Sequence, residues 1–391
     1  MNNILMINYE YPPLGGGGGV FNKHLAEALA QRYSVTVITS RFGQQPTFEI
    51  VNGVELQRVP VALRSDPNAA GLVSMLSFFP SSLLAGIKLL SRRRYDVVHS
   101  LFAIPSAPSA LLLAKLYGKP HLLSILGGDI YDPSKKLSPH RTPLLGHTVA
   151  TVMRASHAVV SLSSDIRQRA YRHYRGVKDI DVIHLGIPEP QYERLRRADF
   201  GYHSGDILLV TVGRLVSRKA VHELIEVVRD LNNPRVKLLV IGDGPQGRQL
   251  KQTAAALNIH RQVRFLGNVD DNTKFGVMAL SDIFVSASRH EGFGLVFLEA
   301  MAVGLPVVSY DNGGQEDFIR NGVSGAMAPN GDKALLLEKI RQLVDKPMLR
   351  QRISQYNQGY AKKFFIEKCA QKYEEKYRSL VKENASGSRK K

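Results

Sequence analysis

Two glutamates on either side of a glycine-rich turn are the residues that most directly suggest chemistry in this sequence. Glu291 and Glu299 flank Gly292 and Gly294. Glycine lets the backbone approach a ligand closely, and a helix N-terminus offers N–H groups and a positive dipole potential to phosphate. Eight residues of helix would span about 12 Å, so a ligand that touches both carboxylates is elongated. A nucleoside diphosphate sugar has that form; the alternative is that both glutamates are solvated charges at helix ends.

The segments around these glutamates predict a strand, a turn, a helix and a second strand. Residues 283–287 are apolar and typical of a buried strand end, and residues 295–302 have the apolar face of a helix. Gly304 and Pro306 end the helix, and residues 307–309 begin the next strand. The turn then lies at the carboxyl edge of a parallel sheet, where ligands bind in open α/β folds.

Cleavage of a sugar-diphosphate bond leaves negative charge on the diphosphate, which needs fixed cations or a metal. Arg214 and Lys219 follow a predicted strand at residues 207–212 and would supply both a fork of donors and a point charge. No D-x-D motif offers a divalent metal, so we expect neither a metal nor a cofactor. The alternative is ordinary surface charge, since Arg218 is also nearby.

Near the N-terminus, a run of glycines separates a predicted strand at residues 4–8 from a predicted helix at residues 20–31. Such a run is too flexible to serve only as a turn, and we expect a loop that approaches the donor phosphate or sugar through Gly16, Gly17, Gly18 and Gly19. No acidic residue follows the second strand at residues 35–39, so the dinucleotide-binding fingerprint is excluded.

Two further polar residues follow or end predicted strands of the first half. Asp129 would orient the donor sugar or the incoming hydroxyl, with a helix N-cap as the alternative. His99 ends the predicted strand 97–99 and would face the same acceptor side, with a buried structural histidine as the alternative.

The remaining pattern is an alternation of strands and helices in two halves. Further strands are expected at 121–125, 158–161, 237–242 and 263–266, and helices at 335–343 and 363–380. This alternation predicts parallel sheets wrapped by helices. A polar stretch at 189–205 divides the halves, and 391 residues suit two domains.

Several motifs, in order along the chain, resemble retaining glycosyltransferases of family 4, whose signature is E-x7-E. They are Y-P-P-L-G-G-G-G-G-V from Tyr11, G-G-D ending at Asp129, V-G-R-L-V-S-R-K from Val212, I-G-D-G-P from Ile241, F-L-G-N-V from Phe265 and G-G-Q-E-D-F from Gly313. The resemblance implies a GT-B fold, with two Rossmann-like doubly wound parallel-sheet domains facing across a cleft. An acceptor-binding domain would occupy 1–190, joined by a C-terminal helix at 361–385, and a donor-binding domain 200–360.

The resemblance also assigns roles to residues. Arg214 and Lys219 would bind the diphosphate, Glu291 the hydroxyls of the donor sugar at the reacting centre, and Glu299 the ribose hydroxyls. Backbone N–H groups for phosphate and contacts to the base would come from Phe293, Gly294, Leu295, Asn268 and Val269. The implied activity is metal-independent transfer of a hexose from a UDP- or GDP-sugar, with retention, to a glycan or lipid-linked acceptor of the cell envelope.

The sequence departs from the family pattern at two places. Ala220 follows Lys219 where relatives usually have glycine, which puts the loop shape in doubt. At the domain hinge, residues 184–188 read H-L-G-I-P where relatives usually show P-N-G-x-D, and of that motif only Gly186 is kept.

Composition restricts the setting. The formal net charge of +18 fits an anionic membrane surface, an anionic substrate or nucleic acid, but no nucleic-acid motif accompanies it. The single cysteine, Cys369, excludes disulfides, and the N-terminus lacks a signal-peptide pattern, so we expect a cytoplasmic protein, peripheral on the membrane if at all. Residues 67–87 carry no charge, and we expect two short amphipathic helices there, packed on the first sheet or touching a membrane.

Three other functions remain open at this stage. A sugar-nucleotide 2-epimerase would use the same donor site without an acceptor. A basic protein that binds nucleic acid or a membrane would use the charge alone, and would show strongly salt-dependent binding. A nicotinamide-dependent oxidoreductase is the most distant alternative.

Overall fold

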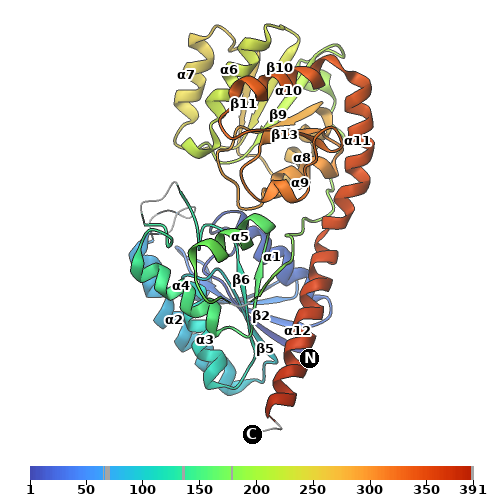
Figure 1. Ribbon diagram of the computed structural model, residues 1–391. Coiled ribbons are helices and arrows are strands. Elements are labelled where there is room, and N and C mark those ends of the chain that lie inside the picture. The colour runs from blue at the N-terminus through green and yellow to red at the C-terminus, as the bar shows by residue number, and fades with distance from the viewer. Residues whose placement is uncertain (65, 67–70, 134–136, 178, 389–391) are drawn as a thin grey trace. The chain divides into compact units, whose positions relative to one another are not determined.

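The computed structural model describes residues 1–64, 66, 71–133, 137–177 and 179–388. The chain folds into two compact units. Unit 1 comprises Met1–Pro188 and Ile366–Lys391, and unit 2 comprises Glu189–Phe365. Each unit is built around its own sheet and is described separately below (Figure 1).

The sheet of unit 1 has the strand order β3-β4-β2-β1-β5-β6-β7-β8. All neighbours pair in parallel except β3 and β4, which pair antiparallel. The central strands are buried on both faces, as expected for a parallel sheet covered by helices. The strands are β1 Asn3–Ile7, β2 Ser34–Ser40, β3 Phe48–Val51, β4 Val54–Val59, β5 Val97–Leu101, β6 His121–Ile125, β7 Ala158–Ser161 and β8 Ile180–Val182.

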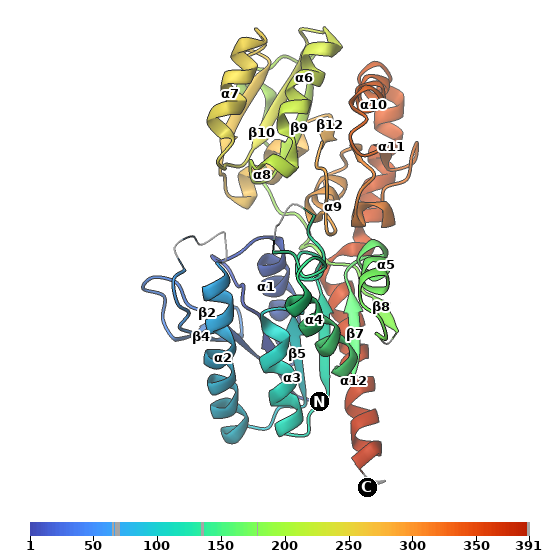
Figure 2. The ribbon, with the colours of Figure 1, turned by 60° about the vertical axis from the view of Figure 1, so that its left-hand side comes forward.

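The order of these strands reverses between β1 and β5. The crossover from β1 to β2 runs one way and that from β5 to β6 the other, so right-handed connections place α1 and α3 on opposite faces of the sheet. Helix α1 packs on α12. Helix α3 packs on α2, as Figures 1 and 2 show. The helices are α1 Gly17–Ala30, α2 Leu72–Arg92, α3 Ser106–Leu116, α4 Pro143–Ala155, α5 Ser164–His173 and α12 Ile366–Ser388.

One continuous helix, α2, replaces the two short helices predicted within residues 67–87. Pro80 lies inside it without ending it. Residues 67–70, where the first predicted helix begins, lie outside the described residues. Among the residues that the structure describes, α2 alone is long and apolar enough, by length and composition, to cross a membrane.

The last helix, α12, belongs to unit 1 and completes its core. The Tyr373 hydroxyl lies 3.0 Å from Ser124 Oγ, and the Tyr377 hydroxyl lies 2.7 Å from His99 Nδ1. At the start of the helix, Ile366 N donates to Ile187 O at 2.8 Å. A Cβ on Gly186 would lie 2.7 Å from Ile366 Cα, so close packing against this helix explains the glycine kept in the altered hinge motif.

The sheet of unit 2 has the order β11-β10-β9-β12-β13-β14 and is parallel throughout. Its strands are β9 Ile207–Val212, β10 Val236–Ile241, β11 Val263–Gly267, β12 Ile283–Val285, β13 Val307–Tyr310 and β14 Gly325–Ala328. Its helices are α6 Val221–Leu231, α7 Gly247–Ala256, α8 Asp271–Leu280, α9 Leu295–Ala302, α10 Lys333–Asp345 and α11 Pro347–Ala361. The strand order reverses between β9 and β12.

The predicted linker at 189–205 is not a free connector. Arg197 donates to the carbonyl oxygens of Leu280 and Asp206, and Leu195 packs against Gly276 of α8. Most of this stretch therefore forms part of the surface of unit 2.

The prediction for the glycine run near the N-terminus is wrong in part. The glycine run is not a loop along its whole length, because α1 begins at Gly17. Helix α1 buries Phe21, Leu25 and Leu29 and exposes Val20.

Candidate active site

The reversal of strand order in unit 2 brings together two loops that carry predicted site residues. The loop after β9 holds Lys219, and the loop after β12 holds Glu291. Lys219 Nζ contacts Glu291 Oε1 as a charged hydrogen bond between residues 72 positions apart. Crevices at such reversal points, outside the carboxyl ends of the strands, are where open α/β sheets bind ligands.

Glu291 is a buried carboxylate that cations hold in its ionised form. It is 7% exposed, and Arg218 Nη1 lies 3.8 Å from Glu291 Oε2. Burial alone would raise the pKa of the Glu291 carboxyl, but the charges of Lys219 and Arg218 outweigh burial and lower its pKa below the ordinary value. Glu291 is therefore an anion at neutral pH, and both of its carboxylate oxygens can accept hydrogen bonds.

The backbone of Glu291 is fixed from the neighbouring loop after β13. Its N–H donates to Asn312 O at 3.2 Å, and its carbonyl accepts from Gly314 N at 3.3 Å. Gly313 lies between these contacts with φ +138°, and a Cβ there would meet Glu291 O at 1.9 Å. The glycine in the G-G-Q-E-D-F motif is thus required for the position of Glu291.

The loop after β9 continues as a 3-10 turn, Ser217–Lys219, which places Lys219 partly buried and leaves Arg214 and Arg218 exposed. The turn ends at Ala220, whose φ is +45°. This is the left-handed region that favours glycine, so the loop keeps the shape that a glycine would allow even though this chain has alanine.

The glycine turn before α9 has the predicted character. Gly294 caps the helix with φ +86°, and a Cβ there would lie 2.3 Å from the ring of Phe297. The Phe293 side chain is buried against Phe318, with ring centroids 5.1 Å apart. Because α9 begins only at Leu295, Glu299 lies about one helical turn into the helix, not two turns from Glu291 as predicted.

Glu299 has a cationic partner that the sequence analysis missed. Lys274 Nζ lies 3.1 Å from Glu299 Oε1 and 2.9 Å from Asp271 Oδ1. Burial lowers the pKa of the Lys274 ammonium, but Glu299 and Asp271 outweigh it and raise that pKa. Each glutamate of the E-x7-E pair is therefore held by a lysine from another segment of unit 2, a pairing that sequence spacing alone does not reveal.

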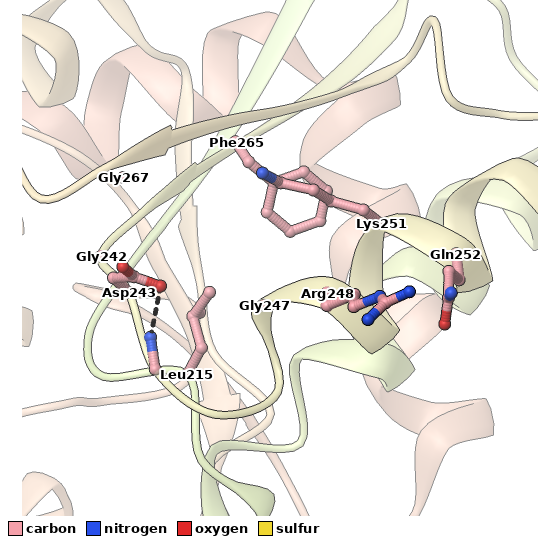
Figure 3. Close-up of a pocket in the computed structure, with 10 residues that line it drawn as sticks. Leu215, Gly242, Asp243, Gly247, Arg248, Lys251, Gln252, Phe265 and Gly267 are labelled. Atoms are coloured by element: carbon pink, nitrogen blue, oxygen red, sulfur yellow. Dashed lines mark hydrogen bonds between the residues drawn. The ribbon is translucent and has the colours of Figure 1, made fainter.

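A cavity of about 460 Å³ opens at the carboxyl ends of β9, β10 and β11. Leu215 N donates to Asp243 O at 2.9 Å across its edge, and the Phe265 ring and the Lys251 side chain lie beside it (Figure 3). The predicted base-contacting residues Asn268 and Val269 follow β11 directly, with Asn268 exposed and Val269 half-buried. Three charged residues of the lining, Asp243, Arg248 and Lys251, were not predicted as site residues. Asp243 could have been, because it belongs to the I-G-D-G-P motif.

The described residues contain no group of three or more His, Cys, Asp or Glu side chains able to hold a metal ion. One D-x-D spacing does occur, at Asp179 and Asp181, contrary to the sequence analysis. It lies at the edge strand β8, where Lys376 Nζ contacts Asp181 Oδ2.

In unit 1, the glycine run lies at the corresponding reversal of strand order, after β1. Gly16 N donates to Glu10 Oε2 at 3.2 Å. A Cβ placed on Gly18 would lie 2.4 Å from the Phe102 ring, and one placed on Gly19 would lie 2.9 Å from Leu14 O. A Cβ on Gly16 would point into open space. Gly17, Gly18 and Gly19 thus form the first turn of α1, and close packing accounts for the last two.

Asp129 is a buried carboxylate that organises loops. Its oxygens accept from the backbone N–H groups of Ala103 at 2.6 Å, Leu126 at 3.0 Å and Gly127 at 2.8 Å. Burial raises the pKa of Asp129 to about 6, against the opposing effect of these hydrogen bonds. It is no helix N-cap; it ties the loop after β6 to the loop after β5.

His99 is part of the core of unit 1 and is not an acceptor contact. It is fully buried, and its two ring nitrogens lie 2.8 Å from Ser124 Oγ and 2.7 Å from the Tyr377 hydroxyl. Burial lowers its pKa to about 3, so the ring is neutral. The prediction that His99 faces the acceptor is therefore wrong, and the structural alternative holds.

Two α/β units, each built on a largely parallel sheet, are the architecture of GT-B proteins. The sucrose-phosphate synthase of Thermosynechococcus elongatus has a similar fold, with a TM-score of 0.82, 18% identity, and coverage of 97% of this chain and 99% of that one. Anabaena Alr3699/HepE, solved in complex with UDP and glucose, gives a TM-score of 0.75 at 19% identity over 97% of this chain and 100% of that one.

The family follows from the sequence models. Residues 15–189 match Glycosyltransferase Family 4, and residues 194–360 match Glycosyl transferases group 1. Together these models cover most of the chain, which therefore belongs to the family 4 (group 1) glycosyltransferases and is an enzyme of the transferase class. A glycogen synthase of Mycobacterium tuberculosis is 28% identical over 370 residues, covering 89% of this chain and 87% of the relative.

Proposed function

We propose that this glycosyltransferase moves a hexose from a nucleoside diphosphate sugar, a UDP- or GDP-sugar, to a glycan or lipid-linked acceptor, with retention and without a metal. The observation that carries the proposal is the contact between Lys219 and Glu291 at the strand reversal of unit 2. It joins a cation suited to diphosphate with a carboxylate suited to sugar hydroxyls, beside the glycine-capped N-terminus of α9.

In this proposal the basic residues bind the diphosphate and the glutamates bind the sugar hydroxyls. Arg214 and Lys219 bind the diphosphate and stabilise the negative charge that develops on it as the bond to the sugar breaks. Glu291 is already ionised and accepts hydrogen bonds from the donor sugar. Glu299, held by Lys274, accepts hydrogen bonds from the ribose, and the N–H groups that begin α9 face phosphate.

The nucleoside occupies the cavity at the ends of β9, β10 and β11 in this proposal. Its lining by Gly242, Gly244, Phe265 and Gly267 offers close backbone approach and an aromatic surface, and Asn268 and Val269 continue the same edge. The complexes of the Anabaena protein with UDP and with UDP-glucose support a uridine nucleotide as the first donor to test.

Unit 1 supplies the acceptor side. We assign Asp129 a positioning role, because its carboxylate already binds three backbone N–H groups and fixes the loops after β5 and β6. Cell-envelope polysaccharide or glycolipid is the proposed product class. The single cysteine, Cys369, is buried, and burial raises its thiol pKa to about 12. We keep a cytoplasmic location as part of the proposal.

The test is transfer from radiolabelled UDP-glucose and GDP-mannose to a mixture of glycan and lipid-linked acceptors, with EDTA present. The proposal expects a labelled product of retained configuration, which is lost in Lys219→Ala. Conversion of the sugar nucleotide to its 2-epimer without any acceptor would instead establish the epimerase alternative. Activity that appears only on addition of Mn²⁺ or Mg²⁺ would contradict the metal-independent mechanism.

A further inference from the structure

Helix α2 exposes six large apolar side chains to solvent, and three of its five buried residues, Ser74, Ser82 and Gly86, are small. Along one side, exposed residues recur from one end of the helix toward the other; they are Leu72, Val73, Leu76, Phe79, Leu84 and Ile87. Leu76 is 63% exposed and Leu84 is 68% exposed. An ordinary surface helix of a soluble protein has polar residues on this side.

The buried side of α2 is specialised for close packing on α3. Ser82 Oγ donates to Ser109 Oγ at 2.8 Å, and a Cβ on Gly86 would meet the Leu113 side chain at 2.2 Å. At the other end, the Ser74 hydroxyl lies 2.5 Å from the Tyr9 hydroxyl. Serine and glycine thus occupy three of the five buried positions of α2, beside Phe78 and Leu90, while six large apolar side chains are exposed to solvent.

Basic residues border this apolar face. Lys88 and Arg92 are the only charged residues of α2, and Arg94 follows it; all three are exposed. The adjacent helix α3 adds the exposed residues Leu112, Leu116 and Lys115, and its sequence also lacks Asp and Glu. The two helices lie side by side in both views (Figures 1 and 2).

We propose that the α2 face, defined as Leu72, Val73, Leu76, Phe79, Leu84 and Ile87 with the basic residues Lys88, Arg92 and Arg94, docks unit 1 onto an anionic membrane surface. The apolar residues enter the boundary between headgroups and acyl chains, and the basic end meets anionic headgroups. The charge pattern favours this occupant over a second copy of the chain, because two copies of this face would bring like charges together.

The packing of α2 in unit 1 indicates that the helix lies on the membrane surface and does not span the membrane. The Ser74 and Ser82 hydroxyls are engaged with other parts of unit 1, and Phe78 is fully buried in its core. If α2 spanned a membrane, these contacts would be lost. The Tyr9 and Ser109 hydroxyls in the core of unit 1 would then lose their serine partners. The proposal is independent of the donor chemistry, so its failure would leave the glycosyltransferase assignment untouched.

The experiment is sedimentation of the full-length protein with vesicles of phosphatidylcholine, alone or with phosphatidylglycerol, at two salt concentrations. We expect binding to the anionic vesicles that weakens with salt, since each basic residue near such a surface contributes about fivefold in affinity. Leu76→Gln combined with Leu84→Gln should weaken this binding at least tenfold. Met348→Gln changes a similarly exposed apolar residue of unit 2 and should have no effect.

Lys88→Gln combined with Arg92→Gln should reduce the salt-dependent part of binding, and Arg261→Gln, at an exposed arginine of unit 2, should not. All α2 substitutions change exposed side chains, and an unchanged melting temperature will show that the fold is retained. The proposal is overturned if wild type does not bind anionic vesicles, or if the α2 variants bind as well as wild type. Resistance to alkaline extraction would show a spanning helix, and a wild-type dimer that Leu76→Gln and Leu84→Gln dissociate would show a second copy; either result also overturns it.

Discussion

Lys219 Nζ contacts Glu291 Oε1 in unit 2, although the two residues lie 72 positions apart in the chain. The contact exists because β9 and β12 are neighbours in the sheet and both loops leave at its carboxyl edge. The proposed diphosphate cation and sugar-binding carboxylate are therefore a pair before any ligand arrives, and the cation stabilises the ionised form of Glu291.

Lys219→Ala should destabilise unit 2 by leaving Glu291 as a buried carboxylate without its nearest cation. Removing one partner of a buried pair costs about 3–5 kcal/mol; because Arg218 remains 3.8 Å from Glu291, we expect a loss nearer about 2 kcal/mol in the free energy of unfolding. Urea denaturation at pH 7 measures it. The matched control is Lys333→Ala, which breaks a more exposed pair with Glu226 and should cost less than about 1 kcal/mol. Equal losses in the two variants would contradict the buried-pair account.

The stability difference between wild type and Glu291→Gln should depend on pH. The pKa of Glu291 is lower in the folded protein than in the unfolded chain, so unfolding takes up a proton at acidic pH and falling pH favours unfolding. The contribution of the carboxylate is complete above its unfolded pKa of 4.5 and is lost as pH falls through the lower folded pKa. Urea titrations of both proteins from pH 7 to pH 3.5 should show the gap narrowing; a gap that widens would contradict the assignment.

Gly313→Ala should be far more disruptive than alanine at a comparable glycine. A Cβ there meets Glu291 O at 1.9 Å, whereas Gly322, also at positive φ, has open space. Backbone strain alone costs about 1–2 kcal/mol, which is our expectation for Gly322→Ala. Gly313→Ala should exceed it clearly and displace Glu291. Gly359→Ala should instead raise stability. Gly359 lies within α11 and faces open space, so alanine should stabilise that helix by up to about 1 kcal/mol. Thermal melts of the three variants test this order.

Ala220→Gly should change stability by less than about 1 kcal/mol, because relief of the positive φ is offset by greater freedom of the unfolded chain and the loss of a buried methyl group. Ala220→Val should lose more than about 2 kcal/mol, since a β-branched residue adds steric strain at positive φ. Nucleotide affinity should be retained in the glycine variant. A marked loss of affinity in Ala220→Gly would show that alanine sets a loop shape of its own.

The sequence predicted the parts of the fold that depend on local pattern. The strands at 207–212, 121–125 and 158–161 have the expected bounds, because parallel strands buried on both faces appear as short apolar runs. Two short helices were predicted where the structure has the single helix α2, and contacts of Ser74 and Ser82 with other elements stabilise that helix. Those contacts are tertiary and leave no local signal.

Only the parts of the candidate site that stand close together in the sequence were predicted, because contacts between distant segments leave no local signal. The glycine turn at Gly294 and the glutamates stand in one short segment, so their spacing is visible in the sequence. The partner Lys219 comes from the loop after β9 and the partner Lys274 from helix α8, and only the tertiary fold brings them to the two glutamates. His99 was placed on the acceptor side because it ends a short apolar run; β5 instead continues to Leu101, and α12 covers the ring through Tyr377.

The most direct test of the donor site is a thermal shift of the full-length enzyme with UDP, GDP and ADP in EDTA, followed by the corresponding sugars. The account predicts that one diphosphate raises the melting temperature without metal, and that Arg214→Ala and Lys219→Ala abolish the shift while Arg261→Ala, an exposed arginine outside the site, keeps it. A ligand at one hundred times its Kd stabilises a folded protein by about 2.7 kcal/mol, which is easily detected. No shift with any of the three at millimolar concentration, or a shift that both site variants retain, would contradict the proposed site.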